Sequence, residues 1–342
     1  MKTAFSYDPS HHEHAAAGHP ERPERLDAVL DVLKGDDVWE RLDHREAAPA
    51  ALDAVRLVHT DDYVKRLERV VRSGGGMLDA DTYATPASLD VAREALGGLL
   101  AVTSAVLEGE ADNGFAAIRP PGHHARPDAA MGFCLFANVA VAARWARRQY
   151  GVERLLIVDF DVHHGNGTQE VFYEDPNVLY MSTHQYPFYP GTGAADETGA
   201  GRGRGATVNV PLPAGAGDDA LLAAFRRILA PLAARFRPEC LFVSAGYDAH
   251  WKDPLGGLNV STNGFSGIMY ELLTWADAFC GNRLVCALEG GYDPEALAHS
   301  VRAGVRRLSD PEAATDDPFG PAPGRPADVS RLLADLAAFH GV

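Results

Sequence analysis

The stretch LLIVDFDVHHGNGT occupies residues 155–168 and sets the expected fold. Its first four residues, Leu155–Val158, form an apolar run of the kind found in strands that are buried on both faces of a parallel sheet. Asp159, Asp161 and His163 follow, and side chains two residues apart project to the same side of an extended chain. Asp161 and His163 could therefore ligate one metal ion, although polar residues at a strand end can also be ordinary solvated loop residues.

Length and composition describe an ordinary globular protein. The chain has 342 residues, of which 46% are hydrophobic and 23% charged, and no linker divides it, so we expect one domain over residues 1–342. No apolar run reaches the ~20 residues needed to cross a bilayer, and the N-terminal residues MKTAFSYDPS lack an apolar signal core. These features predict a cytoplasmic protein with no membrane partner.

Charge and cysteine content narrow the class of partner. The formal net charge of −16 argues against a nucleic-acid partner, since phosphate binding needs clustered Lys and Arg. It is compatible with a cationic substrate, but an acidic surface also serves solubility. Four cysteines without C-x-x-C spacing lie in apolar surroundings and are expected to be buried, reduced thiols: Cys134, Cys240, Cys280 and Cys286.

Strand-like and helix-like segments alternate along the chain. We expect eight strands, which begin near residues 3, 55, 114, 155, 178, 207, 240 and 284. We expect helices at residues 26–33, 61–71, 90–108, 138–150, 218–236, 263–279, 294–308 and 329–339. This alternation predicts an α/β fold with a single eight-stranded, mostly parallel sheet flanked by helices on both faces. A segment rich in Pro, Gly and Asp connects the core, about residues 1–310, to the last helix within residues 311–342.

Four histidines gather in one loop near the N-terminus: His11, His12, His14 and His19. Such a group could form a second metal site. Their irregular spacing favours a loop at the surface or at the rim of a channel.

The segment RPPGHHA, residues 119–125, follows the third expected strand. Its prolines stiffen the backbone and thus favour rings held in place at His123 and His124. Imidazole titrates near neutrality, so an adjacent pair of this kind suits proton transfer.

Two further polar residues follow expected strands, where ligands of such sheets bind. Asp248 comes after the strand at residues 240–244, and Tyr292 comes after residues 284–288 and two glycines. Asp161, His163 and Asp248 would make a three-ligand metal site with an open position, as a catalytic zinc requires. Tyr292 could donate its hydroxyl to an oxyanion. A purely structural role remains the alternative for each residue taken alone.

Five motifs in this order resemble the zinc-dependent histone deacetylase and acetylpolyamine amidohydrolase superfamily, nearer to its class II-like bacterial members. They are RPPGHHA, DFDVHHGNGT, HQYPFYPGTG, AGYDAHWKDPLGG and LEGGYD. The resemblance covers about residues 1–310. It implies an arginase-like α/β fold with a single catalytic zinc, and hydrolysis of the amide between an acyl group and an amine.

The resemblance also implies roles for individual residues. The expected zinc ligands are Asp161, His163 and Asp248. The expected catalytic residues are the acid/base pair His123 and His124, the carbonyl-polarising Tyr292, Asp159 orienting His123, and Asn166 as partner of His124. Class I members have an aspartate in place of Asn166, so we expect His124 to be the neutral base and His123 to be charged.

Two more groups of residues follow from the resemblance. The expected ligands of a structural potassium are Asp159, Ser182 and the backbones of Asp161, His163 and Thr183. A second potassium would lie near Phe172, Asp175 and Val178. Gly132, Phe133 and Tyr189 fall where the family lines a narrow acyl-lysine channel, and Leu255 stands where polyamine-selective relatives have a glutamate.

We therefore expect a zinc deacylase whose substrate is N-ε-acetyl-lysine in proteins or peptides. An acetylpolyamine or another small acylated amine is the alternative substrate, and a non-catalytic acyl-lysine binding module is a remote alternative. DFDVHHGNG supplies too few aspartates for a dinuclear arginase site, and the chain has no G-x-S-x-G nucleophile motif. The native metal, zinc or iron(II), and the oligomeric state stay open.

Overall fold

The apolar run that begins at residue 155 forms strand β6 (Leu155–Asp159), which is buried on both faces. In the computed structural model, which describes residues 1–46 and 48–342, Leu156 and Val158 join one hydrophobic core while Leu155 and Ile157 join the other. Alternate side chains of one strand thus serve two separate cores, as expected for a strand between two layers of helices.

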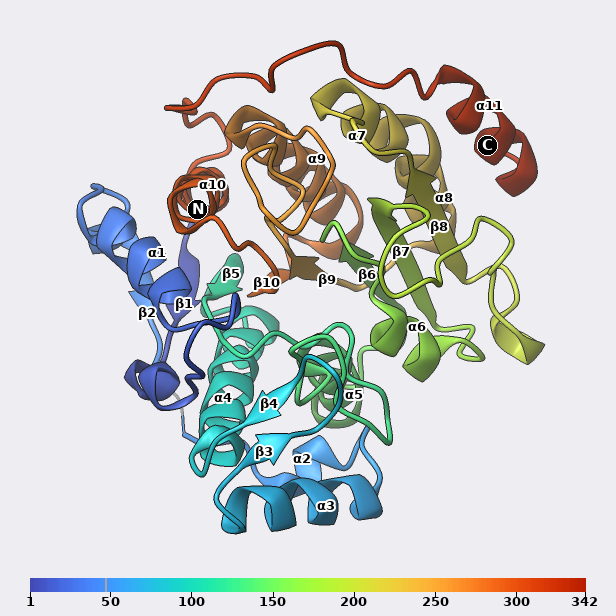
Figure 1. The fold of residues 1–342 in the computed structure, drawn as a ribbon. Coiled ribbons are helices and arrows are strands. Elements are labelled where there is room, and N and C mark those ends of the chain that lie inside the picture. Colours follow the sequence, from blue (N-terminus) through green and yellow to red (C-terminus); the bar gives the residue numbers. More distant parts are fainter. Residues whose placement is uncertain (47) are drawn as a thin grey trace.

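Strand β6 belongs to an eight-stranded sheet with the order β2-β1-β5-β10-β9-β6-β7-β8 (Figure 1). Every neighbouring pair in this sheet is parallel. The other strands of the sheet are β1 (Thr3–Ser6), β2 (Asp43–His44), β5 (Asn113–Ala116), β7 (Val178–Gln185), β8 (Thr207–Leu212), β9 (Cys240–Ala245) and β10 (Leu284–Leu288). A separate two-stranded antiparallel ribbon consists of β3 (Gly76–Met77) and β4 (Tyr83–Ala84).

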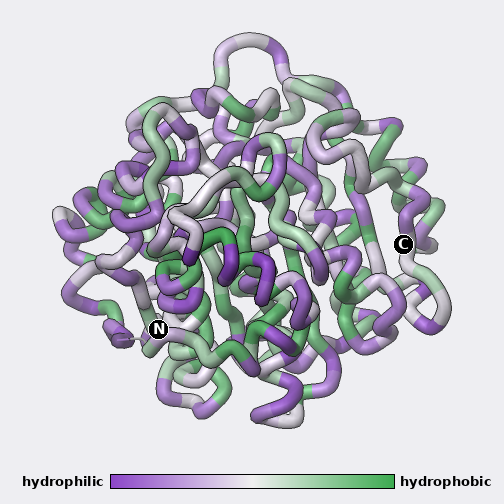
Figure 2. The backbone as a smooth tube through the Cα atoms, turned by 60° about the horizontal axis from the view of Figure 1, so that its bottom comes forward, coloured by the Kyte–Doolittle hydropathy of each residue, from purple (hydrophilic) through white to green (hydrophobic). Residues whose placement is uncertain are grey.

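Helices cover both faces of the sheet, and in Figure 1 they lie above and below the strands. One layer includes α1 (Glu24–Lys34), α7 (Asp218–Ala224), α8 (Ala230–Phe236), α9 (Thr262–Cys280), α10 (Pro294–Ser309) and α11 (Ser330–His340). The opposite layer includes α2 (Leu52–Val55), α3 (Asp61–Arg72), α4 (Ser88–Leu107) and α5 (Asn138–Tyr150). Hydrophobic segments run through the interior of the backbone trace in Figure 2.

Shorter helical segments complete the chain: α6 (Asn166–Phe172) and the 3₁₀ turns η1 (Pro9–Glu13), η2 (Trp39–Arg41) and η3 (Gly201–Gly203). The four cysteines are buried free thiols, as expected. Within the described ranges 1–46 and 48–342, we find no helix with the length and apolar content needed to cross a membrane.

The expected strand at residues 55–58 is wrong. Val55 ends helix α2, and its side chain is buried with Ala54 beneath the neighbouring helices. Val55 and Val58 are three residues apart, a spacing that suits one side of a helical turn as well as a short strand. The eighth strand is instead β2, whose two polar residues, Asp43 and His44, are too few to produce a periodic signal.

The expected single helix over residues 218–236 consists of three pieces. Helix α7 passes into a π-helical turn at Phe225–Leu229 and then into α8. Pro231 stands in the first turn of α8 and has no backbone N–H, so the regular hydrogen-bond ladder cannot continue through this position.

The histidine-rich loop lies less at the surface than expected. His11 and His14 are buried, and His14 Nδ1 lies 2.6 Å from the Ser88 hydroxyl. His19 stands edge-on to Phe133, with ring centroids 4.7 Å apart. The loop therefore reaches from the surface at His12 to the interior, because its neighbours α1 and α4 cover it.

Candidate active site

Five neighbouring strands, β5, β10, β9, β6 and β7, end at the same edge of the sheet. The loops that follow them carry the RPPGHHA segment, the EGGYD segment, Asp248, the DFDVHHG segment and Tyr189. Because parallel strands place their carboxyl ends side by side, residues that are far apart in the sequence meet in one place.

Asp161, His163 and Asp248 form the centre of this place. Each offers one ligand atom, and these atoms all lie within 4.8 Å of one another. His163 Nδ1 is 3.1 Å from Asp161 Oδ1 and 3.2 Å from Asp248 Oδ2. One imidazole nitrogen thus faces two carboxylates, which is a donor set that zinc accepts.

Backbone amides hold both carboxylates in position. Val162 N donates to Asp248 Oδ1 at 2.8 Å, and Gly290 N donates to Asp161 Oδ2 at 2.8 Å. A Cβ atom at Gly290 would lie 2.0 Å from Asp248 Oδ2, so only glycine leaves room for the carboxylate here. The sequence thus provides both the ligands and the space for them.

The two buried carboxylates of this cluster favour a bound cation. Burial, together with the nearby Asp161 carboxylate, raises the pKa of Asp248 to about 7. Burial opposes the charged form of His163, but its hydrogen bonds to Asp161 and Asp248 raise its pKa to about 10. Without a metal, a proton on His163 therefore balances the charge of the carboxylates. A divalent metal bound there would replace this proton.

His123 and His124 lie beside the cluster, with ring centroids 4.0 Å apart. His123 Nδ1 is 3.1 Å from Asp159 Oδ2, and its Nε2 is 3.8 Å from Asp161 Oδ1. His124 Nδ1 is 2.8 Å from Asn166 Oδ1. In both rings Nδ1 meets the orienting side chain, which leaves Nε2 free for chemistry.

The two histidines have opposite pKa shifts. Burial lowers the pKa of His124 well below its usual value, and the charges of His123 and His163 lower it further. Burial also opposes the charged form of His123, but the carboxylates of Asp161 and Asp159 raise its pKa well above the usual value. Such a pair can hold one proton and accept another at the same pH.

Tyr292 follows β10 and is buried beside the cluster. Its backbone N donates to Asp253 Oδ2 at 2.6 Å, and the Arg25 guanidinium lies 4.7 Å from its ring centroid. Burial, followed by the charges of Asp248 and Asp161, raises its pKa well above the usual value. The phenol therefore keeps its proton and can donate a hydrogen bond.

Two aromatic rings contact the residues beside the cluster. Phe133 stands edge-on to Tyr292 with centroids 5.7 Å apart, and Tyr189 stands edge-on to His124 with centroids 5.1 Å apart. Gly132 has φ +55°, and a Cβ atom there would lie 2.4 Å from the His124 ring. Leu255 lies in a turn whose backbone N donates to Asp253 Oδ1 at 2.9 Å, so Asp253 fixes both Leu255 and Tyr292.

Reasoning from sequence missed three residues of this site. Phe188 stacks on His163, with ring centroids 5.4 Å apart and planes 14° apart. Glu289 Oε2 accepts from the backbone N atoms of Gly122 and His123 at 2.6 and 3.1 Å. Asp253 is the third. Glu289 and Asp253 lie within the motifs LEGGYD and AGYDAHWKDPLGG, but neither motif indicates which backbone amides these carboxylates bind.

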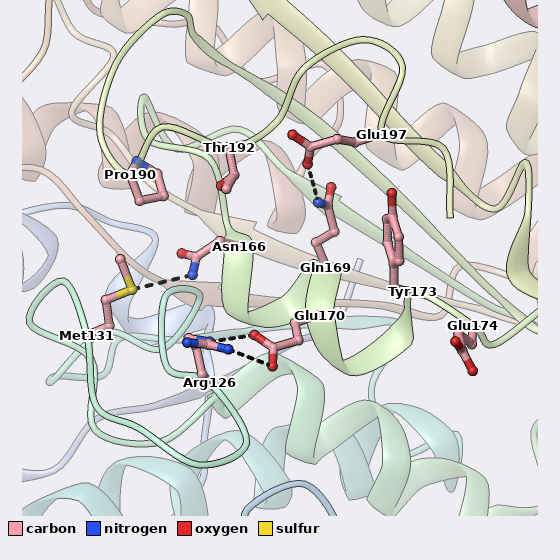
Figure 3. A pocket seen from close by; sticks show the side chains of 10 residues that line it. All are labelled: Arg126, Met131, Asn166, Gln169, Glu170, Tyr173, Glu174, Pro190, Thr192 and Glu197. Atoms are coloured by element: carbon pink, nitrogen blue, oxygen red, sulfur yellow. Dashed lines mark hydrogen bonds and ion pairs between the residues drawn. The ribbon is translucent and has the colours of Figure 1, made fainter. Parts of the chain in front are cut away.

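Asn166, the partner of His124, also lines a pocket of about 680 Å³ (Figure 3). Asn166 Nδ2 donates to Met131 Sδ at 3.5 Å, and Arg126 pairs with Glu170 on α6. The amide of Asn166 is therefore held from both sides, which keeps its oxygen directed at His124.

The residues expected to bind potassium lie on adjacent strands. The register of β6 and β7 pairs Asp159 with Ser182, and both are buried. Ser182 Oγ lies 2.8 Å from His184 Nδ1, whereas Thr183 Oγ1 is buried without a hydrogen-bond partner among the described residues. These are hard oxygen donors of the kind that an alkali cation accepts.

The second expected potassium position is more restricted. Asp175 pairs through its carboxylate with Arg147 at 2.5 Å, so its negative charge is already balanced. Asp175 N donates to the Phe172 carbonyl at 2.9 Å, and Val178 N lies 3.4 Å from the Asp175 carbonyl. Backbone carbonyls with a second lone pair could still accept a cation there.

Comparisons with known proteins agree on one family. A model described as "Histone deacetylase domain" matches residues 19–308. A probable deacetylase from Methanothermobacter thermautotrophicus is 44% identical over 334 residues, which cover 97% of this chain and 96% of the relative. A histone deacetylase-like amidohydrolase from Pseudomonas aeruginosa is 42% identical over 309 residues, covering 89% and 80%.

A solved structure extends this likeness to three dimensions. The structure titled "Crystal Structure of HDA15 HD domain" matches 99% of this chain and 94% of its own with a TM-score of 0.90 and 36% identity. The expected α/β fold class is thereby confirmed.

Proposed function

The chain belongs to the histone deacetylase family and is a hydrolase of the deacetylase type, and we propose that it hydrolyses N-ε-acetyl-lysine in proteins or peptides. The observation that carries the proposal is the meeting of the Asp161, His163 and Asp248 ligand atoms beside the paired rings of His123 and His124.

Asp161, His163 and Asp248 would hold the zinc ion on which this family generally depends. A zinc ion bound there supplies a Lewis acid that polarises the substrate carbonyl and makes water acidic. The amides of Val162 and Gly290 fix the carboxylates beforehand, so the ligands need little reorganisation.

His124 acts as the general base. Its Nδ1–H donates to Asn166 Oδ1, and its low pKa keeps Nε2 unprotonated at neutral pH. The Nε2 lone pair then accepts a proton from the attacking water.

His123 acts as the general acid. Asp159 accepts from its Nδ1–H, and the raised pKa keeps the ring charged, so Nε2 carries a proton. This proton passes to the leaving amine nitrogen, which cannot depart as an anion.

Tyr292 stabilises the developing oxyanion by donating its phenolic hydrogen. The high pKa of the phenol keeps this hydrogen in place, and Phe133 and Arg25 restrict the ring on two sides. A donor of this kind typically contributes ~3–4 kcal/mol to the transition state.

The aromatic rings beside the cluster favour a substrate with an apolar, linear stem. Phe133, Phe188 and Tyr189 offer ring surfaces to the methylene groups of lysine. Leu255 offers no charge to a second ammonium, which favours acetyl-lysine over an acetylpolyamine.

Asp159, Ser182 and the backbone of Thr183 would help to hold a structural potassium, as the family resemblance implies. The pairing of Asp159 with Ser182 on adjacent strands supports this assignment. A cation there would steady the carboxylate that orients His123.

The test compares kcat/KM for an acetyl-lysine peptide, N8-acetylspermidine and acetylputrescine with the full-length, zinc-loaded protein. The proposal expects the peptide to be hydrolysed most efficiently. A preference for either polyamine would overturn the substrate assignment, and peptide binding without hydrolysis would identify a binding module instead.

Leu255→Glu tests the role of this side chain directly. The new carboxylate should raise kcat/KM for acetylspermidine relative to the peptide, since it can receive the secondary ammonium. Pro254→Glu places the same charge on the exposed neighbouring residue and serves as the matched control. An equal response of both variants would argue against a position for Leu255 at the channel.

A further inference from the structure

A second group of metal-binding side chains lies on the N-terminal segment, apart from the site described above. His11 and His12 stand on η1, and Asp27 stands on α1. His11 Nε2 and His12 Nε2 lie 3.1 and 3.2 Å from the same oxygen, Asp27 Oδ1. We propose that His11, His12 and Asp27 form a second, structural site for a divalent transition metal of the zinc type.

The hydrogen bonds of His11 support a cation at this point. His11 Nδ1 lies 2.7 Å from the carbonyl oxygen of Asp8, and Nε2 faces the carboxylate of Asp27. Both partners are hydrogen-bond acceptors, whereas a neutral imidazole has only one N–H. A neutral His11 therefore leaves one contact without a hydrogen, and a metal between Nε2 and Asp27 Oδ1 satisfies it.

The orientation of His11 is the one found in metal sites. Ligating histidines commonly donate their other ring N–H to a backbone carbonyl, which fixes the ring and leaves the free nitrogen directed at the metal. Here the backbone carbonyl of Asp8 accepts the N–H of His11 Nδ1. His11 is buried, so its ring is held firmly by the surrounding chain.

The spacing of the donors suits tetrahedral zinc. Zn–N and Zn–O bonds of about 2.0–2.1 Å place neighbouring ligand atoms roughly 3.3 Å apart. The two nitrogen-to-oxygen distances of 3.1 and 3.2 Å come close to this value. The His12 side chain is 58% exposed and that of Asp27 is 37% exposed, so water can reach a fourth coordination position.

Two imidazoles and one carboxylate also select the class of metal. These donors suit Zn²⁺, Co²⁺, Ni²⁺ and Cu²⁺ better than Mg²⁺ or Ca²⁺, which prefer oxygen ligands. Since η1 and α1 supply the ligands, a bound metal would join the two segments. The His11 carbonyl accepts a hydrogen bond from Arg119, so the joined segments support the start of the RPPGHHA loop.

Equilibrium dialysis against Zn²⁺ tests the site. Full-length wild type, His12→Gln, Asp27→Asn and Asp31→Asn are dialysed at a series of buffered free Zn²⁺ concentrations, and zinc per chain is measured by mass spectrometry. Asp31 is exposed one turn further along α1, so Asp31→Asn removes the same charge outside the site. Zinc bound at Asp161, His163 and Asp248 is the same in all four proteins. It therefore does not contribute to the difference between each variant and wild type.

Wild type and Asp31→Asn should bind one more zinc per chain than the other two variants, or bind it at least ~10-fold more tightly. Equal zinc binding by all four proteins would overturn the proposal, as would a loss in Asp31→Asn as well. Thermal unfolding gives a second measurement. Added Zn²⁺ should raise the Tm of zinc-loaded wild type but not that of zinc-loaded Asp27→Asn, and the same rise in both would also overturn the proposal.

Discussion

His124 Nδ1 lies 2.8 Å from the amide oxygen of Asn166, whereas the corresponding nitrogen of His123 lies 3.1 Å from the carboxylate of Asp159. Two adjacent histidines thus have a neutral and an anionic partner. Since an anionic partner favours imidazolium, the difference in partners assigns different proton states to the two rings.

Asn166→Asp should remove this difference. A carboxylate at 2.8 Å would stabilise the charged form of His124 and raise its pKa by roughly one unit or more. His123, His163 and Asp161, which also act on His124, are unchanged. The base works only when unprotonated, so the acidic limb of the kcat/KM profile should move to higher pH.

The matched control for that profile is Asn177→Asp, which makes the same change on the exposed turn before β7. It should leave the acidic limb in place. An Asn166→Asp profile that coincides with wild type would show that His124 is not the base.

Tyr292→Phe removes the proposed oxyanion donor without altering the metal ligands. We expect kcat to fall by at least ~100-fold while zinc content stays the same. Tyr247→Phe is the control, since the Tyr247 hydroxyl is buried without a hydrogen-bond partner among the described residues. Near wild-type turnover in Tyr292→Phe would refute the role of the phenol.

Much of the fold follows from patterns that the sequence displays directly. The continuous apolar run of β6 indicates a buried parallel strand, which the structure has, and the polar residues after it, Asp161 and His163, lie together with Asp248. Helix α5 matches its expected bounds because Asn138–Tyr150 is amphipathic and Gly151 ends it in the left-handed conformation.

Other features depend on contacts that no local pattern records. Strand β2 exists because Asp43 and His44 pair with β1 at the sheet edge, and two residues carry no period. His14 is buried because Ser88 of α4 and Glu21 lie next to it, 74 and 7 residues away in the sequence. Contacts between residues this far apart in the sequence cannot be predicted from a local sequence pattern.

Metal affinity at Asp161, His163 and Asp248 should depend strongly on pH. Hydrogen bonds to both carboxylates raise the pKa of His163 to about 10. His163 must therefore release a proton before it can bind a metal. The apparent Zn²⁺ affinity should therefore rise about tenfold per pH unit above pH 7. Below pH 7 the slope should steepen, because Asp248, with a pKa of about 7, must also lose a proton.

Competition with a chelator of known affinity measures this slope between pH 6 and 8. The Asp248→Asn variant has no carboxyl proton to release at position 248, so its slope should not steepen below pH 7. An affinity independent of pH in wild type would mean that His163 is not a ligand.

A buried ion network includes Arg25, which lies against the Tyr292 ring, and it predicts an acid-sensitive stability. Glu21 binds Arg119 at 2.7 Å and Arg25 at 3.0 Å, and all three side chains are fully buried. Burial opposes the charge on Glu21, but Arg119 lowers its pKa to about 2 from an ordinary 4.5. Glu21→Gln would leave two buried guanidinium groups without a counter-charge, so we expect a loss of about 3–5 kcal/mol at pH 7.

The pH dependence of that loss distinguishes charge from packing. The pKa of Glu21 is lower in the folded protein than in the unfolded chain, so its charge stabilises the fold. This stabilisation is complete above pH 4.5 and is lost as the pH falls towards 2. Urea unfolding should therefore show the gap between wild type and Glu21→Gln narrowing over this range. Asp335→Asn, which breaks the exposed pair with Arg331, should cost less than ~1 kcal/mol at either pH. A gap for Glu21→Gln that does not change with pH would instead indicate lost packing.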